Sequence, residues 1–399
     1  MPSNLSEVAL VSGKFCSAVL IGFLSILLGC GGVGSKSSGG STPSPTPSPS
    51  ATPTAIKNVV VIVMQNRSFD HLFGTFPGAN GITPTGAGFS QQDRSGKTVT
   101  PFLLTSLAPA DMEHTRNAML RVWDNGKMDK YAFFNGDNAM GHYDNTTPEM
   151  NILWGWAQQF ALADNFFPSV MGDAPSNQLY LVAADDNNNP ASIEPAFGPC
   201  NQGTQAPPYS FPHVAGQLAA KGLSWAWYQE NLGKCGGGYI PQENPFQFFV
   251  DTHASPNIKD LSAFAGDLNS GQFPAVAFVE AGPNHDMHPA IGVPVTAGIT
   301  WLDGFLKQIQ ASPIWNNAVI VVVWDSSGGW YDHVPPPQVD AQGLGQRVPM
   351  MVISPLSKKN YISHVQMDDV SILRFIQGTF GLTPLNARNQ ISSDLSDMF

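Results

Sequence analysis

The chain has 399 residues, of which 42% are hydrophobic and only 12% charged, and its formal net charge is −11. This composition indicates a folded protein with a large core and excludes a mostly disordered chain. No basic cluster is present, so nucleic acid is not an expected partner, and an anionic substrate would need local positive charge or a metal ion.

The N-terminal segment contains an apolar run, VLIGFLSILLGC, that ends at Cys30. The run is shorter than a membrane span needs and suits the apolar core of a signal peptide. Its last four residues, LLGC, resemble a bacterial lipobox, in which the cysteine is lipidated and becomes the first residue of the mature chain. We therefore predict a signal peptide over residues 1–29 and an exported protein that Cys30 anchors to the bacterial cell envelope, on its periplasmic or outer-membrane face. The alternatives are an ordinary signal peptide and an uncleaved anchor.

Residues 30–55 are rich in serine, threonine, proline and glycine. Such a composition cannot form a core, so we expect an extended tether that holds the following domain away from the membrane. Two cysteines, Cys200 and Cys235, remain in that domain. In an exported protein they suggest one disulfide, and the alternative is two buried free thiols.

Residues 56–399 are predicted to form one α/β domain. Short apolar runs typical of strands buried on both faces occupy residues 58–64, 224–229, 275–280, 318–324 and 348–354. Helical patterns occupy residues 113–126, 147–161, 211–223, 296–312 and 367–381. Continuous Val/Ile runs separated by helices favour a mainly parallel central sheet flanked by helices.

Polar loops follow three of the predicted strands: QNRS after residues 58–64, AGPNHDMHP after 275–280 and DSSGGWYDHVPPP after 318–324. In open α/β sheets the ligand lies outside the carboxyl ends of the strands, so we expect these loops to converge on one site. Their Asp, His and Asn side chains suit a divalent metal ion, which could hold a phosphate ester. The alternative is that these residues only cap turns.

Several long motifs resemble one known family. The segments QNRSFDHLFGTFPGANGI, HDMHP and DSSGGWYDHVPPP are similar to the bacterial phosphoesterase family that contains phosphatidylcholine-type phospholipase C and a related acid phosphatase. The resemblance extends from Lys57 almost to the C-terminus. It implies an alkaline-phosphatase-like three-layer α/β sandwich, hydrolysis of phosphate esters with phospholipids among the candidate substrates, and a divalent metal ion of unspecified identity.

The resemblance also implies a metal site. Gln65 and Asn66 occupy the positions of a Glu-Asn pair in the family, and Asp325 and Ser326 occupy the positions of two adjacent acids. We therefore expect these four residues to be metal ligands. Gln65 and Ser326 would bind more weakly because each lacks the negative charge of the carboxylate that it replaces.

The predicted catalytic residues match the family pattern only in part. His114, Asp286 and His288 match active-site elements of the family. The loop GDAPSNQ, residues 172–178, matches the loop that carries a Ser or Thr nucleophile, but a gap-free match places Ala174 at that position and Gln178 where the family has histidine. Alanine cannot form a phosphoryl-enzyme intermediate.

Two alternatives could supply the attacking oxygen that Ala174 lacks. A shifted loop would present Ser176 as the nucleophile, or a metal-activated water would attack directly. The competing interpretation of Ser176 is an N-cap of the following helix. Asn177, in the same loop, is a candidate for substrate binding.

Two further residues are candidates for the site. His333 follows a tight Gly-Gly turn that indicates a close approach of the backbone to another group, so it is a candidate catalytic residue. The alternative is a histidine packed against the prolines that follow it. Arg67 is a candidate phosphate ligand because a guanidinium matches phosphate geometry, and it could instead pair with Asp70.

Two hypotheses for function therefore remain. The first is a membrane-tethered phosphoesterase. The second is a catalytically degenerate member of the family that acts as an envelope binding protein, which the changes at Gln65, Ala174, Gln178 and Ser326 favour.

Overall fold

The computed structural model describes residues 55–189, 195, 198–200, 208–289 and 292–399. The predicted signal peptide, Cys30 and nearly all of the predicted tether lie outside these residues. All described residues belong to one unit, which spans residues 49–399. Within these ranges, no helix has both the length and the apolar character that a membrane span requires.

A nine-stranded sheet forms the centre of the domain, in the order β12-β6-β11-β10-β1-β9-β7-β8, with β13 also paired to β6. β1 pairs in parallel with both β9 and β10, whereas β11 runs antiparallel to β10 and β6. The sheet is therefore mainly parallel, as predicted. Its strands are β1 (Asn58–Met64), β6 (Ala161–Phe167), β7 (Trp225–Gln229), β8 (Ile258–Asp260), β9 (Val276–Glu280), β10 (Ala318–Trp324), β11 (Val348–Ile353), β12 (Tyr361–Ser363) and β13 (Met367–Asp368).

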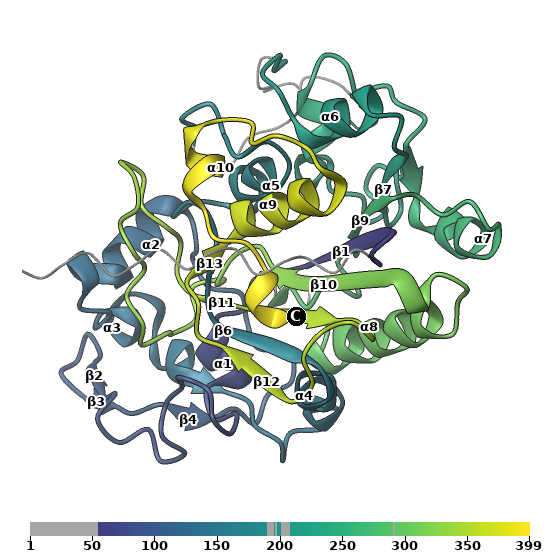
Figure 1. Cartoon of the computed structure of the whole chain (residues 1–399). Helices are drawn as coiled ribbons and strands as arrows, with labels where there is room; N and C mark the ends of the chain where they lie inside the picture. Colours follow the sequence, from purple (N-terminus) through teal and green to yellow (C-terminus); the bar gives the residue numbers. More distant parts are fainter. Residues whose placement is uncertain (1–54, 190–194, 196–197, 201–207, 290–291) are drawn as a thin grey trace, which may run out of the picture. The chain divides into compact units, whose positions relative to one another are not determined.

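Helices cover both faces of this sheet. Figure 1 shows α5, α9 and α10 on one side and α4 and α8 on the other, which gives the predicted three-layer arrangement. The helices are α1 (Phe69–Phe73), α2 (Arg116–Trp123), α3 (Tyr131–Asn135), α4 (Met150–Gln159), α5 (Ala174–Ala183), α6 (Val214–Ala220), α7 (Phe264–Asn269), α8 (Val295–Gln310), α9 (Asp369–Phe380) and α10 (Ala387–Ile391). Two small strand pairs lie apart from the main sheet: β2 (Gln91–Gln92) with β3 (Thr98–Val99), and β4 (Phe102–Leu103) with β5 (Gly141–His142).

The strands at the centre of the sheet are buried along almost their whole length. In β1 only the first residue, Asn58, is partly exposed, and every residue of β10 is buried. Strands covered on both faces need no alternation of polar and apolar residues, so β-branched side chains can occupy successive positions. This is why the Val/Ile runs predicted these strands to within one or two residues.

Strand β6 was not predicted, and its first residue, Ala161, lies at the end of a predicted helix. The strand reads ALADNFF and contains Asp164 and Asn165, which have low strand propensity. It becomes a strand because it lies between β11 and β12 and hydrogen-bonds to both. Tertiary pairing therefore overrides its weak local preference.

A buried ion-pair network joins α1, the loop after β10 and the start of β11. Arg347 is fully buried, and its Nε donates to Asp332 Oδ1 at 3.0 Å while its Nη2 donates to Asp70 Oδ1 at 3.0 Å. Asp70 Oδ2 accepts a hydrogen bond from the backbone N–H of His333 at 2.8 Å and lies 2.7 Å from its Nδ1. We call Arg347, Asp70, Asp332 and His333 the Arg347 network.

The Arg347 network corrects the predicted catalytic role of His333. Its Nδ1 contacts Asp70, and its Nε2 lies 3.3 Å from Asn80 Oδ1, so both ring nitrogens have partners in the protein. Burial lowers the pKa of His333, but the hydrogen bond to Asp70 and the charges of Asp70 and Asp332 outweigh it, and the net pKa is raised. His333 is therefore a structural residue.

A disulfide joins Cys200 to Cys235, with the two Cα atoms 5.1 Å apart. Such cross-links persist in oxidising compartments, and this one is compatible with an exported domain.

Replacing Arg347 with methionine should lower the free energy of unfolding by about 3–5 kcal/mol, because two buried carboxylates lose their cation. Urea unfolding monitored by circular dichroism would measure this. The matched control is Arg94→Met, at an exposed arginine whose Nε donates to Phe133 O. That change should cost about 0.5 kcal/mol or less. Equal losses in the two variants would contradict the structural role of the network.

Candidate active site

The three polar loops that follow β1, β9 and β10 meet at one edge of the sheet. The backbone N–H of Gln65 donates to Asp286 O at 2.7 Å, and that of Asp325 donates to Met64 O at 3.2 Å. Ser68 Oγ donates to Tyr331 O at 2.6 Å. The predicted convergence is therefore confirmed, and it follows from the parallel pairing of three adjacent strands.

A cleft of about 330 Å³ opens at this edge. Its wall includes Gln65 and Asn66 after β1, residues 111–115 before α2, residues 173–175 at the start of α5, Gln242 with Glu243, and His288. Four of the lining side chains are acidic, and none is lysine or arginine. An anionic substrate in this cleft would therefore need positive charge from another source.

Two buried carboxylates lie at the inner end of the cleft, linked by two side-chain amides. Gln65 Nε2 donates to Glu280 Oε1 at 3.1 Å and to Asp325 Oδ2 at 2.9 Å. Gln178 Nε2 donates to Glu280 Oε2 at 3.2 Å and to Asp325 Oδ2 at 3.1 Å. Only the NH₂ end of an amide can donate to a carboxylate, so this orientation follows from the acceptors. We call these four residues the amide bridge.

The amide bridge decides whether the predicted metal ligands fit a divalent ion. Gln65 directs NH₂, not oxygen, toward Asp325, and Asp325 Oδ2 already accepts two amide hydrogen bonds. Ser326 Oγ accepts the Gly328 N–H at 3.4 Å. Of the predicted set, only Asn66 Oδ1 and Asp325 Oδ1 are buried oxygens with no partner among the described residues. The four residues therefore do not fit as a metal site.

Burial changes the protonation of the acids at this end of the cleft. It raises the pKa of Asp325 to about 7, although hydrogen bonds from Gln178 and Gln65 act in the opposite direction. Burial, together with the charges of Glu243 and Asp325, raises the pKa of Glu280 well above its ordinary value. The pKa of Glu243 is also raised well above its ordinary value by burial and by the charges of Asp286 and Asp325. Burial therefore disfavours the ionised form of each of these carboxyl groups.

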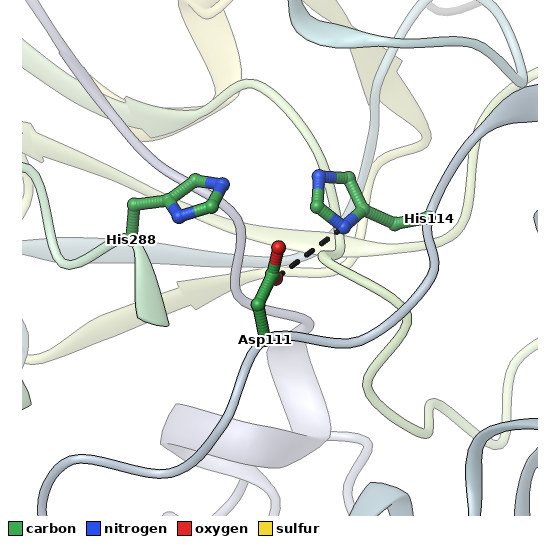
Figure 2. Close-up of side chains that lie close together, drawn as sticks. All are labelled: Asp111, His114 and His288. Atoms are coloured by element: carbon green, nitrogen blue, oxygen red, sulfur yellow. Dashed lines mark ion pairs between the residues drawn. The ribbon is translucent and has the colours of Figure 1, made fainter. Parts of the chain in front are cut away.

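A second group of side chains lies in the more exposed part of the cleft. Ligand atoms of Asp111, His114 and His288 all lie within 4.8 Å of one another. Figure 2 shows the two imidazoles and the carboxylate directed toward a common space. We call these three residues the outer Asp–His cluster. Burial lowers the pKa of His288 to about 4, so its imidazole is neutral at pH 7.

Two groups of three Asp and His side chains in the described part of the chain could hold a metal ion. The first is the outer Asp–His cluster, and the second is Asp70, Asp332 and His333. In the second group the carboxylates already bind the Arg347 guanidinium, which supplies the compensating charge. In the outer Asp–His cluster, Asp111 Oδ1 lies 3.5 Å from His114 Nδ1.

The predicted nucleophile loop leads into α5. Ala174 is the first residue of α5 and lines the cleft, so the predicted nucleophile position carries a methyl group. Ser176 is fully buried, and its Oγ donates to Asn189 O at 2.8 Å. The shifted-nucleophile prediction for Ser176 is therefore wrong. The alternative is wrong as well, because the N-cap residue of α5 is Asp173.

Asn177 is also a structural residue and not a substrate ligand. It is buried, its Oδ1 accepts the Val170 N–H at 3.0 Å, and its Nδ2 donates to Gly172 O at 3.3 Å. These bonds shape the loop that leads into α5. The position of Ala174 at the cleft depends on that loop.

Arg67 does not reach the cleft. It is fully buried, and its Nε and Nη2 donate to Met287 O at 2.9 and 2.7 Å, while its guanidinium lies over the Trp330 ring. The predicted phosphate contact is therefore wrong. The alternative partner, Asp70, binds Arg347 instead.

Asp286 does not line the cleft and instead contacts a residue that does. It is fully buried, and its Oδ1 accepts the His288 N–H at 2.7 Å. Burial raises the pKa of Asp286 to about 7. It therefore positions His288, whereas His114 and His288 themselves line the cleft.

Three acidic residues of the site were not predicted. Glu280 is the last residue of the predicted strand AVAFVE, and this position at the end of a buried strand could have indicated a site residue. Asp111 lies three residues before His114, a spacing that could have indicated a shared site. Glu243 lies in a short turn, Pro241–Glu243, and had no signal in the sequence.

Comparisons with known proteins place this chain in a family. A model of the phosphoesterase family matches residues 56–383, so the protein belongs to the phosphoesterase family. The chain is 25% identical to the non-hemolytic phospholipase C of Pseudomonas aeruginosa, over 86% of this chain and 57% of that protein. It is 27% identical to phospholipase C B of Mycobacterium tuberculosis, over 86% of this chain and 77% of that protein. These relationships support a phosphoric ester hydrolase.

The chain spans little more than half the length of the Pseudomonas relative. Among solved structures, it is similar to a protein in the alkaline phosphatase superfamily from Vibrio parahaemolyticus, with a TM-score of 0.45 and 10% identity over 87% of this chain and 72% of that one. The sheet order, and not this likeness, is the basis for the fold described above.

Replacing Asp325 with asparagine should stabilise the protein at high pH more than at low pH. The folded pKa of Asp325, about 7, exceeds the ordinary value of 3.8, so the folded state favours the protonated form. Its stability contribution is therefore complete below about pH 4 and is lost as the pH rises to about 7. The advantage of the variant should grow by about 1.4 kcal/mol per pH unit across that range.

Urea unfolding of Asp325→Asn and of the parent at about pH 5 and about pH 8 would measure this difference. A stability difference that is the same at both pH values would contradict the raised pKa of Asp325.

Proposed function

We propose that this protein hydrolyses phosphate ester bonds in the cleft at the carboxyl ends of β1, β9 and β10. Phosphomonoesters and phosphodiesters, including phospholipids, form the substrate class. One observation carries the proposal: in a chain of the phosphoesterase family, the fold brings Asn66, His114 and His288 to the wall of one cleft. The names of the relatives, which are phospholipases C, support phospholipid as the substrate.

The cleft has two sources of positive charge for a phosphate group. Residues Thr115 and Asp173, at the N-termini of α2 and α5, line it. Helix N-termini attract anions through their unpaired N–H groups and the helix dipole. A divalent ion bound in the cleft would supply the remaining charge and would lower the pKa of a bound water.

The attacking oxygen comes from water in this proposal. Ala174 offers no hydroxyl, and Ser176 directs its hydroxyl to Asn189 O, away from this role. No phosphoryl-enzyme intermediate would then form on the α5 loop. Water would form its bond to phosphorus in the same step that breaks the bond to the leaving oxygen, and the proton lost by the water would pass to solvent.

Glu243 would protonate the leaving oxygen. It lines the cleft, and burial raises its pKa well above the ordinary value, which favours the protonated carboxyl group. A protonated carboxyl beside the substrate is the arrangement that general acid catalysis requires. A protonated Glu243 also reduces the repulsion between the acidic wall and the phosphate.

The second candidate function is binding without catalysis. The methyl group of Ala174 at the nucleophile position favours it. Under this alternative the cleft would hold a phosphate ester without cleaving it, and the protein would act as an envelope binding protein.

We also propose that the protein is exported and anchored to the cell envelope through a lipid on Cys30. The lipobox-like sequence LLGC and the composition of residues 30–55 support this, and a disulfide in the domain is compatible with it. Metabolic labelling with a radioactive fatty acid tests the proposal. Label should appear in the parent and not in Cys30→Ala, and label in neither would overturn it.

Glu243→Gln should reduce kcat by about 10²–10⁴ on phosphatidylcholine, whose alcohol leaving group needs a proton. It should reduce kcat far less on p-nitrophenyl phosphorylcholine, because nitrophenolate leaves without protonation. Steady-state kinetics on the two esters measure the difference. Equal losses on both would contradict the role of Glu243 as the acid.

Ser176→Ala is the matched control for the nucleophile. It should keep the kcat of the parent, and loss of turnover by the folded variant would restore the shifted-nucleophile interpretation. Absence of turnover on both esters with zinc, manganese, magnesium or calcium would overturn the enzyme proposal. Turnover that appears only in the double variant Ala174→Ser, Gln65→Glu would identify a degenerate enzyme.

A further inference from the structure

The outer Asp–His cluster has the geometry of a metal site. Asp111 and His114 come from the segment before α2, whereas His288 comes from the loop after β9. Despite this separation in sequence, their ligand atoms lie within 4.8 Å of one another, and Figure 2 shows them directed into one space. The fold therefore brings together one carboxylate and two imidazoles.

The surrounding groups hold the imidazole of His114 and the backbone of His288 in place. His114 Nδ1 lies 2.6 Å from Met112 O and 3.5 Å from Asp111 Oδ1, so Nδ1 carries the proton and Nε2 presents its lone pair. The backbone N–H of His288 donates to the buried Asp286 Oδ1 at 2.7 Å. A histidine whose other ring nitrogen donates to a backbone carbonyl is typical of metal ligands in proteins.

Asn66 provides an independent sign of a missing ligand. Its side chain is only 3% exposed, and its Oδ1 has no partner among the described residues. Its Nδ2 lies 3.4 Å from His114 Nε2, the nitrogen that would coordinate a bound ion. Rotation of this amide by 180° would turn the unpartnered oxygen toward the cluster.

The inner end of the cleft is closed to a cation by the amide bridge. The NH₂ groups of Gln65 and Gln178 make four hydrogen bonds to Glu280 and Asp325. An ion bound between these carboxylates would have to displace those bonds. It would also need oxygen ligands that the two NH₂ groups cannot provide.

We infer that the divalent ion of this cleft binds to Asp111, His114 and His288, and not to the predicted set of Gln65, Asn66, Asp325 and Ser326. Two imidazoles and one carboxylate suit zinc or a similar first-row ion, whereas magnesium and calcium prefer all-oxygen sites. Three protein ligands leave a coordination position open for water or substrate. The inference rests on the proposed function for the role of the ion, but metal binding itself can be measured without substrate.

The test is zinc binding by the full-length protein after removal of metal with a chelator. Isothermal titration with zinc alone should show one site in the parent. His114→Ala and His288→Ala should each weaken zinc binding by about 100-fold or more, because loss of even an outer partner costs about 10–100-fold. Cobalt should give an absorption spectrum with a nitrogen-ligand signature that both variants lose.

Two controls separate this site from the other candidates. His333→Ala removes an imidazole from the second Asp–His group, and Asp325→Asn replaces one carboxyl group of the amide bridge with an amide. Both should bind zinc as the parent does. Circular dichroism of each variant without metal would establish that it is folded, and His288→Gln provides a milder second variant.

The outcomes are decisive in both directions. No zinc binding by the parent, or zinc binding that Asp325→Asn or His333→Ala weakens while His288→Ala does not, overturns the inference. Zinc binding at the outer cluster without any ester turnover supports the inference and overturns the proposed function. Turnover that persists in a protein that binds no zinc supports the proposed function and overturns the inference.

Discussion

The parallel pairing of β1 with both β9 and β10 is the constraint on which the site depends. The registers align Val63 with Glu280 and Met64 with Trp324, so the three strands end at nearly the same level. The residues that follow, Gln65 and Asp325 among them, must therefore emerge side by side. Because both faces of the sheet are covered, these polar groups have little access to water and must find partners in one another.

The protein satisfies its buried acids in two different ways. Asp70 and Asp332 share the full positive charge of Arg347, a pairing that joins distant segments into one core. Glu280 and Asp325 instead receive only neutral amide donors from Gln65 and Gln178. Neutral donors offset less of the cost of burying charge than a guanidinium does. The pKa values of Glu280 and Asp325 in the amide bridge are therefore raised. The first arrangement supports the fold, and the second leaves the cleft sensitive to pH.

The departures from the family pattern are consistent with one another. A glutamate at position 65 would place a third carboxylate against Glu280 and Asp325, which would repel them unless a cation lay between. Glutamine at 65 and at 178 removes that need, and Ala174 removes the hydroxyl that such a cation would activate. Gln65 and Gln178 thus act together on the same two carboxyl groups. In the proposed mechanism, metal binding and proton donation fall to the outer residues His114, His288 and Glu243.

Much of the fold could be predicted from the chain alone. The Val/Ile runs of β1 and β10 have few alternatives to buried strands, and their polar termini indicated where a site would form. The family resemblance added the fold class and the type of reaction. Strand β6 was missed because its Ala, Asp and Asn residues become a strand only through pairing with β11 and β12.

The roles of individual side chains depended on the tertiary structure. Arg67, Ser176 and Asn177 look like site residues in sequence, but each is buried and bonded to backbone carbonyls or amides. Glu243 had no local signal at all. Gln65 is 215 residues from Glu280 and 260 from Asp325. By itself, the sequence determined the strands, their polar ends and the family, because those depend on local patterns. Only the tertiary structure decided which polar groups meet, because the direction and charge of a side chain depend on neighbours that are remote in the chain.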